Sequence, residues 1–398
     1  MSRMQHAVAT AAAPIPNAVI DVTRLVGRLA KRRLPTGIDR VCLAYVQRYA
    51  ESARAALHRG PLDIILPASA SSDLFATLLK PPQGLLRRIA HVLARGTLRA
   101  WRQPNCAGSL LLNVGHSGPE QPRYTDWLRQ KGLRPVFMVH DVIPVTHPEY
   151  CRPREQQRHA RRLDNMLSIA AAVVTNSRAT LRGLTEYAVN RGLTMPPATA
   201  APLAATPFEA SADIRPLAAP YFVMLSTIEP RKNHSMILQV WRRLIQQHGA
   251  NAPRLVIVGQ RGWECENVLD LLERCDLLRG FVLEKSVCSD AELATYLRHA
   301  EALLFPSFVE GYGLPLVEAL SLGVPAIVSD LPVFREVADD VPEYLDPLDA
   351  IGWLRCIESF CQRNSVLRAN QMLRMSKFVA PTWAGHFEVF EQLLRELN

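Results

Sequence analysis

The stretch that decides the fold reads Phe305-Pro-Ser-Phe-Val-Glu-Gly-Tyr-Gly-Leu-Pro-Leu-Val-Glu-Ala-Leu-Ser-Leu-Gly-Val-Pro325. The apolar run 302–305 predicts a buried strand, and the turn after it contains glycines that let backbone approach a ligand closely. Residues 314–322 have helical spacing and end at a glycine and a proline. A helix start of this kind presents free N–H groups and a positive dipole end, which together bind phosphate. Glu310 and Glu318 lie on either side of this predicted phosphate site.

Short apolar runs recur along the whole chain, separated by helical stretches. They lie at 18–22, 62–66, 109–114, 136–139 and 170–175 in the first half, and at 221–225, 254–258, 281–283, 302–305 and 326–329 in the second. Runs that are apolar on both faces are typical of parallel sheets covered on both sides by helices. The stretch 191–220 is rich in Ala, Pro and Thr and is predicted to be a linker. The sequence therefore predicts an α/β protein with two doubly wound, Rossmann-like domains facing across a cleft.

Length and composition set the domain organisation. The chain of 398 residues is longer than a single domain with one hydrophobic core usually is. We expect an N-terminal domain over 1–200, a C-terminal domain over 201–380, and a final helix over 381–398 that packs back toward the first domain. A second amphipathic helix, over 353–360, is also expected to pack across the junction. The eight cysteines are scattered without a Cys-x-x-Cys pair, which predicts neither a disulfide framework nor a zinc site and indicates a reducing cytoplasm.

The net charge of +9 is divided unequally along the chain. Residues 1–210 carry 28 Lys and Arg against 13 Asp and Glu, whereas 211–398 carry 18 against 24, so the halves have charges of +15 and −6. Residues 80–102 contain six basic and no acidic residues and fit an amphipathic helix on an anionic membrane surface. The alternative is a helix packed on the core with a solvated arginine face. No nucleic-acid motif accompanies the charge, so a nucleic-acid partner is not expected.

A second loop places two cations at the start of a helix. The strand 221–225 leads into Ser226-Thr-Ile-Glu-Pro-Arg-Lys-Asn-His234, in which Asn233 is expected to cap the following helix. Arg231 and Lys232 oppose the helix dipole, so an anionic group should compensate them. A diphosphate fits because Arg offers a fork of donors and Lys a point charge. A solvated surface pair is the alternative.

The Arg-Lys-Asn loop and the motif Pro-Ser-x-x-Glu-Gly-x-Gly-Leu-Pro-x-x-Glu-Ala together resemble the donor half of the retaining GT-B glycosyltransferases of family four. The resemblance is close within 221–340 and thinner before it. It implies that Glu310 contacts hydroxyls of the donor sugar and that Glu318 binds the ribose of the nucleotide. It also implies that Arg231 and Lys232 neutralise the diphosphate leaving group. Backbone N–H groups of the helix start would bind the diphosphate, at Gly311, Tyr312, Gly313 and Leu314.

Four further positions share in the resemblance. Val282 lies in the segment that would bind the base, and Gly259, at a strand end, would form the floor of the nucleotide pocket. Gly37, in Thr36-Gly-Ile-Asp-Arg40, resembles the family's glycine loop, although Thr36 replaces the first of its two glycines. His140, in a His-Asp-x-Ile-Pro pattern at a strand end, resembles the active-site histidine that hydrogen-bonds the donor sugar. A lone histidine is otherwise most often structural, and Glu318 without its motif would be a solvated helix residue.

The resemblance implies a retaining, nucleotide-sugar-dependent hexosyltransferase. No metal or other cofactor is expected, because the basic pair can do a metal's work and no Asp-x-Asp pair follows a strand of the cleft. The phrases Thr-Ile-Glu-Pro-Arg-Lys-Asn and Thr-Gly-Ile-Asp-Arg look like those of bacterial mannosyltransferases of surface polysaccharide and lipopolysaccharide synthesis, which favours GDP-mannose over a UDP- or dTDP-sugar. The expected acceptor is a saccharide or lipid-linked saccharide. The expected location is the cytoplasm, peripheral on the inner face of the membrane.

Two other functions are compatible with the sequence. A sugar-nucleotide epimerase shares the two-domain fold but requires no lipid-facing basic helix. A non-catalytic scaffold of polysaccharide assembly would keep the fold without turnover. A Rossmann dehydrogenase is disfavoured, because no Gly-x-Gly-x-x-Gly follows a strand.

Overall fold

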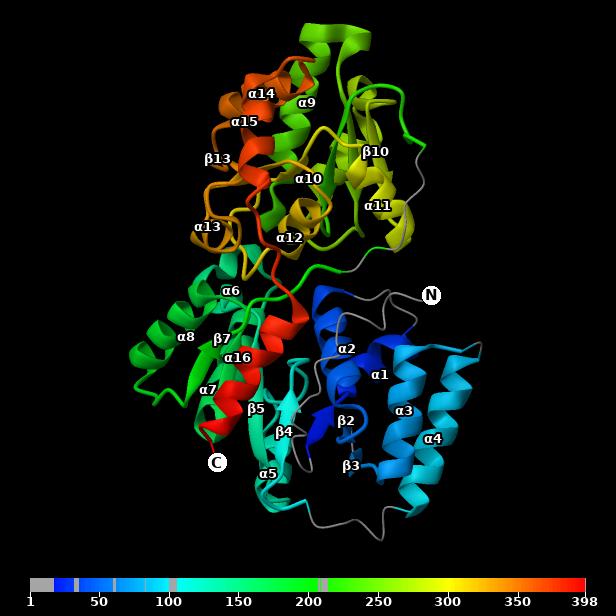
Figure 1. The fold of residues 1–398 in the computed structure, drawn as a ribbon, viewed down its shortest axis with the longest axis vertical. Coiled ribbons are helices and arrows are strands. Elements are labelled where there is room, and N and C mark those ends of the chain that lie inside the picture. Colours follow the sequence, from blue (N-terminus) through cyan, green and yellow to red (C-terminus); the bar gives the residue numbers. More distant parts are fainter. Residues whose placement is uncertain are drawn as a thin grey trace. The chain divides into compact units, whose positions relative to one another are not determined.

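The chain forms two compact α/β units (Figure 1). The computed structural model describes residues 18–31, 36–59, 62–82, 84–99, 106–206, 208 and 214–397. The N-terminal unit comprises residues 1–146, 154–203 and 382–398, and the C-terminal unit comprises 147–153 and 204–381. Each unit contains one predominantly parallel sheet in which the strand order reverses once, as in doubly wound folds. The predicted α/β class with two doubly wound, Rossmann-like domains is confirmed.

The sheet of the N-terminal unit has the strand order β3-β2-β1-β4-β5-β6-β7. Neighbouring strands are parallel except β2 and β3, which are antiparallel. The strands are β1 (Val19–Asp21), β2 (Arg54–Arg59), β3 (Leu62–Ile65), β4 (Leu110–Asn113), β5 (Arg134–Val139), β6 (Ala172–Thr175) and β7 (Ala198–Ala200). The sequence pattern does not predict β2, because arginines and His58 interrupt its apolar run. It is wrong at β3, which is not parallel, and at β7, which lies within the predicted linker.

The sheet of the C-terminal unit is wholly parallel in the order β10-β9-β8-β11-β12-β13. Its strands are β8 (Tyr221–Leu225), β9 (Arg254–Val258), β10 (Val282–Lys285), β11 (Leu303–Phe305), β12 (Ala326–Ser329) and β13 (Glu343–Leu345). Five of the six coincide with predicted runs to within two residues at each end. The sequence pattern does not predict β13, because this three-residue edge strand has only partly buried side chains.

Helices connect the strands of both sheets. Those of the N-terminal unit are α1 (Thr23–Ala30), α2 (Gly37–Tyr49), α3 (Ala68–Leu79), α4 (Leu85–Arg99), α5 (Pro122–Gln130), α6 (Ile143–Thr146), α7 (Glu155–Ile169), α8 (Arg178–Arg191) and α16 (Trp383–Arg395). Those of the C-terminal unit are α9 (His234–His248), α10 (Glu266–Arg274), α11 (Asp290–Arg298), α12 (Leu314–Ser321), α13 (Pro332–Ala338), α14 (Ala350–Cys361) and α15 (Val366–Met375), with 3₁₀ turns at η2 (Pro148–Tyr150), η3 (Pro230–Lys232), η4 (Gly249–Asn251) and η5 (Asp276–Leu278).

The strand order of each sheet marks one place for a ligand. In doubly wound sheets, ligands bind beyond the carboxyl ends of the strands where the order reverses. This switch point lies between β1 and β4 in the N-terminal unit and between β8 and β11 in the C-terminal unit. The loops after β8 and β11 carry the Arg231-Lys232 pair and Glu310, so the topology brings the two sequence motifs to one sheet edge.

The two helices predicted to cross the junction behave differently. The buried face of α14 joins the apolar core of the C-terminal unit through Trp353, Ile357 and Phe360, so its prediction as a bridging helix is wrong. The last helix, α16, groups with the N-terminal unit. Its Phe387 and Phe390 rings pack edge-on against Tyr45 of α2, with ring centroids 5.1 Å apart in each pair.

The basic helix α4 lies beside α3 (Figure 1). Ile89 and Val92 of α4 are buried, while Arg87, Arg88 and Arg95 are exposed. The apolar side of α4 thus packs on the unit itself, as in the core-packed alternative, and an arginine-rich side faces solvent. Within the ranges that the structure describes, no helix combines the length and the apolar character needed to cross a bilayer.

A mostly buried ion pair fastens α16 to α2. Glu391 Oε1 accepts hydrogen bonds from Arg48 Nη2 at 2.8 Å and from the Tyr49 hydroxyl at 3.0 Å, and the Arg48 and Glu391 side chains are only 8% and 13% exposed.

Removal of one partner from such a pair leaves an uncompensated charge. We therefore expect Glu391→Ala to lower the free energy of unfolding by about 3 kcal/mol, measured by urea unfolding. Glu388→Ala, an exposed position on the same helix, should change it by less than about 0.5 kcal/mol. Equal effects of the two variants would contradict the prediction.

Candidate functional site

Two loops at the switch point of the C-terminal unit are joined by charged side chains. Arg231 and Lys232 lie in η3, directly after β8, and Glu310 lies in the loop between β11 and α12. Arg231 Nη1 is 2.8 Å from Glu310 Oε2, and Lys232 Nζ forms an ion pair with Glu310 Oε1. Three residues predicted for the site are therefore in direct contact.

Two residues without a predicted role complete this cluster. Glu229 Oε1 is 2.5 Å from Arg231 Nε, and the Ser307 hydroxyl donates to Glu310 Oε1 at 2.8 Å. The cluster of Glu229, Arg231, Lys232 and Glu310 thus balances two cations with two carboxylates. Both missed residues lie inside the quoted motifs, so the signal for them was their position beside the predicted site residues.

Burial and neighbouring charges both shift the pKa values of this cluster, and at Glu310 their effects are opposite. Burial alone would raise the pKa of Glu310, but the Arg231 and Lys232 charges outweigh it and lower that pKa to about 2. Burial, followed by the neighbouring Arg231 charge, lowers the pKa of Lys232. Burial also raises the pKa of Glu229. Glu310 consequently stays ionised across the physiological range.

Backbone contacts fix the relative position of the two loops. The Phe308 N–H donates to Arg231 O at 2.9 Å, and Arg231 Nη1 donates to Val309 O at 3.2 Å. Gly259, at the end of β9, lies so close to the loop after β8 that a Cβ atom there would be 1.9 Å from Ser226 O. A side chain at Gly262 would likewise meet Ile228 O, at 2.6 Å. These glycines therefore admit the loop that carries Arg231 and Lys232, which gives Gly259 a packing role beside the predicted one.

The start of α12 has the backbone that the sequence indicates. Gly313, immediately before the helix, has φ +107°, and a Cβ atom there would lie 2.7 Å from the Phe334 ring. The N–H of Leu316 is already bonded to Gly313 O at 2.9 Å, and Pro315 has none to give. Of the predicted amides, those of Gly311, Tyr312 and Gly313 lie in the turn between Glu310 and this helix, and Leu314 is the first residue of the helix.

Other predicted residues have contacts of their own. Glu318 of α12 is buried and accepts a hydrogen bond of 2.6 Å from the Thr206 hydroxyl. Asn233 occupies the predicted N-cap position of α9, but it has φ +56° and its side chain makes no hydrogen bond to the helix start; its Nδ2 donates instead to Pro347 O at 2.7 Å. Val282 is the first residue of β10 and packs against the apolar core. It lies three residues, about 10 Å, before the carboxyl end of that strand.

In the N-terminal unit, His140 lies at the carboxyl end of β5 and is buried. Its Nε2 donates to Val114 O at 2.8 Å, because a carbonyl can only accept, so Nδ1 is the ring atom for any contact with a ligand. The His140 backbone N–H donates to His116 Nε2 at 3.2 Å. Burial lowers the pKa values of His116 and His140, so both rings are neutral near pH 7.

Gly37 is the first residue of α2 rather than part of an open glycine loop. The Thr36 N–H, just before it, donates to Asp39 Oδ2 at 2.7 Å. Asp39 is buried and also pairs with Arg24 and Arg28, each at 2.7 Å. The Thr-x-x-Asp spacing resembles a helix capping box, and that pattern is the signal by which Asp39 could be found. Among the described residues, no group of three or more His, Cys, Asp and Glu side chains is arranged to hold a metal ion.

The C-terminal unit carries a family signature. Residues 210–342 match the model of the family Glycosyl transferases group 1. The chain is similar to the serotype-specific mannosyltransferase WbdA of Escherichia coli, with 29% identity over 247 residues, which cover 57% of this chain and 30% of WbdA. It is also similar to the O-antigen chain mannosyltransferase B of Escherichia coli, with 30% identity over 224 residues, 54% of this chain and 58% of that protein. The chain thus spans about a third of WbdA. The resemblance indicated by the two motifs is confirmed.

A solved structure extends the likeness to both units. The Anabaena protein HepE, crystallised in complex with UDP, superposes on 96% of this chain and 100% of its own with a TM-score of 0.63 and 13% sequence identity. At this identity the likeness establishes the fold alone, which is GT-B.

His234, next to Lys232, provides a pH test of this site. Its side chain is 1% exposed, and burial, then the Lys232 charge, lowers its pKa to about 3. The unfolded chain therefore binds this proton more readily, so stability is retained above about pH 6.5 and falls as the pH drops toward 3. We expect His234→Gln to reduce the loss of unfolding free energy between pH 7 and pH 5 by about 2 kcal/mol. Gln247→Ala, at an exposed position of α9 that carries no ionisable group, should leave the wild-type slope unchanged. An unchanged slope in His234→Gln would refute the assignment.

Proposed function

We propose that this protein is a retaining glycosyltransferase that moves mannose from GDP-mannose to a saccharide or lipid-linked saccharide acceptor in surface polysaccharide synthesis. The observation that carries the proposal is the meeting of Arg231, Lys232 and Glu310 at the switch point of the C-terminal unit. The similarity to O-antigen mannosyltransferases supports the choice of mannose. In this proposal, residues 1–200 bind the acceptor, 201–380 bind the nucleotide sugar, and 381–398 complete the N-terminal unit.

Catalysis would be mainly electrostatic. Departure of the nucleoside diphosphate leaves positive charge on the sugar and negative charge on the leaving oxygen. Arg231 and Lys232 supply two cationic groups for that oxygen, together with the N–H groups at the start of α12. This is the work that a metal ion does in other transferases, so we propose that transfer requires no metal.

The carboxylates have separate proposed roles. Glu310 binds hydroxyls of the donor sugar and Glu318 binds the ribose, while His140 binds the sugar from the N-terminal unit. Since Glu310 is bound to both cations, a diphosphate would share Arg231 and Lys232 with it. Donor binding would thereby loosen Glu310 and allow its oxygens to accept hydrogen bonds from the sugar.

The central prediction concerns the basic pair. We expect Lys232→Met to lower kcat/KM for hexose transfer from GDP-mannose by about 10²-fold or more, because the leaving group loses a preorganised cation. Arg231→Gln, at a side chain that is 22% exposed, provides a second variant with less risk to folding. The assay is run with and without EDTA, and product NMR reports the configuration of the new bond.

Each outcome of this assay separates the alternatives. Lys377→Met, at an exposed lysine of the same unit, should retain wild-type activity. Conversion of the free nucleotide sugar without transfer would establish the epimerase. Folded variants that still support polymer formation in cells would favour the scaffold. Loss of activity in EDTA would overturn the metal-independent proposal, and an inverted product would overturn retention.

We also propose that the exposed side of α4 contacts the anionic inner face of the cytoplasmic membrane. Its support is the exposure of Arg87, Arg88 and Arg95 on a helix whose Ile89 and Val92 are buried. Attraction would therefore be electrostatic, at about 1 kcal/mol per basic residue near the surface. Lipid-linked acceptors would be presented at the same surface.

Vesicle binding tests this surface. The double variant Arg87→Glu and Arg88→Glu should bind vesicles of phosphatidylglycerol and phosphatidylcholine at least about 10-fold more weakly than wild type at low salt, in a sedimentation assay. Arg182→Glu, at an exposed position on α8, should bind like wild type. Equal binding to vesicles of phosphatidylcholine alone, or no loss in the double variant, would refute the proposal.

A further inference from the structure

A polar cavity of about 480 Å³ lies at the switch point of the N-terminal unit. Its walls come from the segment after β1 (Thr23 and Arg24), the segment after β4 (residues 116–121), Asp141 after β5, and the first turns of α7. This position is where doubly wound sheets bind ligands, and the volume falls within the range of about 300–1,000 Å³ for small-molecule sites. The cavity belongs to one unit and none of the roles proposed above uses it.

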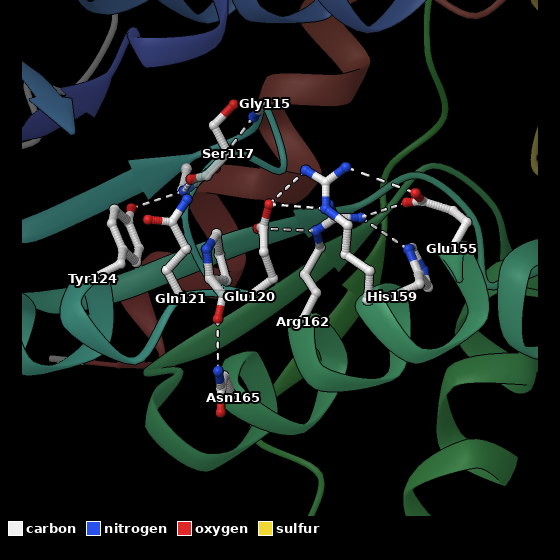
Figure 2. Close-up of polar contacts among 12 residues, drawn as sticks. Gly115, Ser117, Glu120, Gln121, Tyr124, Glu155, His159, Arg162 and Asn165 are labelled. Carbon is white, nitrogen blue, oxygen red and sulfur yellow. Dashed lines mark hydrogen bonds and ion pairs between the residues drawn. The ribbon is translucent and has the colours of Figure 1, made fainter. Parts of the chain in front are cut away.

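A carboxylate held between two arginines forms one wall (Figure 2). Glu120 Oε1 is 2.6 Å from Arg158 Nη2, and Glu120 Oε2 is 3.5 Å from Arg162 Nε. Arg162 is 8% exposed and also lies 4.0 Å from Glu155. Asn165 Nδ2 donates to Pro119 O at 2.7 Å and so fixes the loop that carries Glu120.

The histidines of the wall are neutral. His159 Nε2 donates to Asp141 O at 3.2 Å, and its Nδ1 accepts from Arg162 Nη1 at 2.9 Å. Burial lowers the pKa values of His116 and His159. Neither ring therefore adds positive charge near pH 7.

The charges that line the cavity cancel. Its arginines are Arg24, Arg158 and Arg162, and its carboxylates are Glu120, Asp141 and Glu155. Arg24 is in addition paired with Asp39 at 2.7 Å. A phosphate would meet arginines that already have carboxylate partners, and Glu120 would repel it. Alternating donors and acceptors instead match a neutral ligand with many hydroxyl groups.

Two buried atoms of this wall have unused hydrogen-bonding capacity. Glu120 Oε2 and Arg162 Nε face each other as an ion pair at 3.5 Å, yet neither makes a hydrogen bond. Buried polar groups without hydrogen bonds are costly, so a group that can bond them is favoured here. A sugar hydroxyl both donates and accepts, and can therefore serve Glu120 and Arg162 together.

We propose that this cavity binds the neutral terminal sugar of the acceptor, with Glu120 accepting hydrogen bonds from its hydroxyls and Arg162 positioning Glu120. Only the identification of this ligand as the acceptor rests on the proposed function. That the ligand is a neutral saccharide is inferred from the side chains that line the cavity. Its place beside His116, which receives the His140 backbone N–H, puts the acceptor next to the residue proposed to bind the donor sugar.

Binding of simple glycosides to the full chain tests this site. The probes are methyl glycosides of mannose, glucose, galactose and N-acetylglucosamine, followed by saturation-transfer NMR. We expect at least one to bind wild type and to bind Glu120→Gln at least about tenfold more weakly, since a hydrogen bond to a charged group is lost. Asp126→Asn, at an exposed carboxylate of α5, should bind like wild type.

A second variant covers the case in which Glu120→Gln fails to fold. Ser117→Leu fills the cavity without touching an ion pair and should also abolish glycoside binding. Absence of glycoside binding to wild type, binding unaffected in the folded variants, or displacement of the glycoside by inorganic pyrophosphate would each overturn the inference.

A nucleotide-sugar arm separates this inference from the proposed function. GDP-mannose should raise the Tm of wild type, Glu120→Gln and Ser117→Leu alike, because the donor residues are unchanged. If no nucleotide sugar stabilises wild type while glycoside binding still depends on Glu120, the proposed function fails and the saccharide site stands. If GDP-mannose stabilises all three proteins and no glycoside binds, the proposed function stands and the saccharide site fails.

Discussion

The largely buried ion-pair cluster of Glu229, Arg231, Lys232 and Glu310 is the constraint on which the C-terminal unit depends. Charges can be buried only when they are paired and hydrogen-bonded, because desolvation of an isolated charge costs several kcal/mol. The loops after β8 and β11 must therefore meet, and Ser307 and the Phe308 N–H complete that contact. The packing of Gly259 and Gly262 against the first loop serves the same end, since a side chain at either position would displace the cations.

The switch points of the two units have the same topology but are lined by different side chains. Each strand order reverses once, and each reversal opens the sheet edge to polar side chains. In the C-terminal unit the cluster pairs two cations with two carboxylates, and Arg231 is 22% exposed, so under the proposed function an anion can compete with Glu310 for Arg231. In the N-terminal unit the arginines alternate with carboxylates around a cavity, so a neutral polar ligand is favoured. The formal charge of +15 on residues 1–210 thus resides elsewhere than in the cavity, in part on the exposed side of α4.

Apolar runs in the sequence predict most of the strands, because a strand buried on both faces must itself be apolar. The apolar runs that became β8, β9 and β12 carry their own signal of burial. Strands β2, β7 and β13 carry little, since they are short, charged or only partly buried and are held by their neighbours. The bridging role assigned to 353–360 is wrong for a related reason: an amphipathic pattern shows that a helix has a partner, not which partner it has.

The candidate sites divide along the same line. Arg231, Lys232 and Glu310 could be found because each lies in a motif, whereas the pairing of Glu120 with Arg162 joins α7 to a loop after β4 that has no motif of its own. Asn233 shows that a correct local pattern can still give the wrong contact. Asn is preferred at helix N-caps because its side chain can bond the helix start from an extended backbone, whereas this residue has φ +56°. The motifs therefore identified the charged side chains of the site. Only the tertiary structure shows which of these charges are already paired with an opposite charge.

Exposure separates the two cations of the C-terminal site. Lys232 is 9% exposed, and its Nζ lies 5.0 Å from the centre of the Phe305 ring, so burial and the aromatic face hold it in place. Arg231 is 22% exposed, and its Nε contacts Glu229 while its Nη1 contacts both Glu310 and the Val309 carbonyl. Under the proposed function, Arg231 is thus the group that can turn toward a diphosphate while Glu229 keeps its Nε, and Lys232 remains beside Glu310. One movement of the Arg231 side chain would then free its Nη1 for the diphosphate and Glu310 Oε2 for the sugar, while Lys232 keeps its pair with Glu310 Oε1.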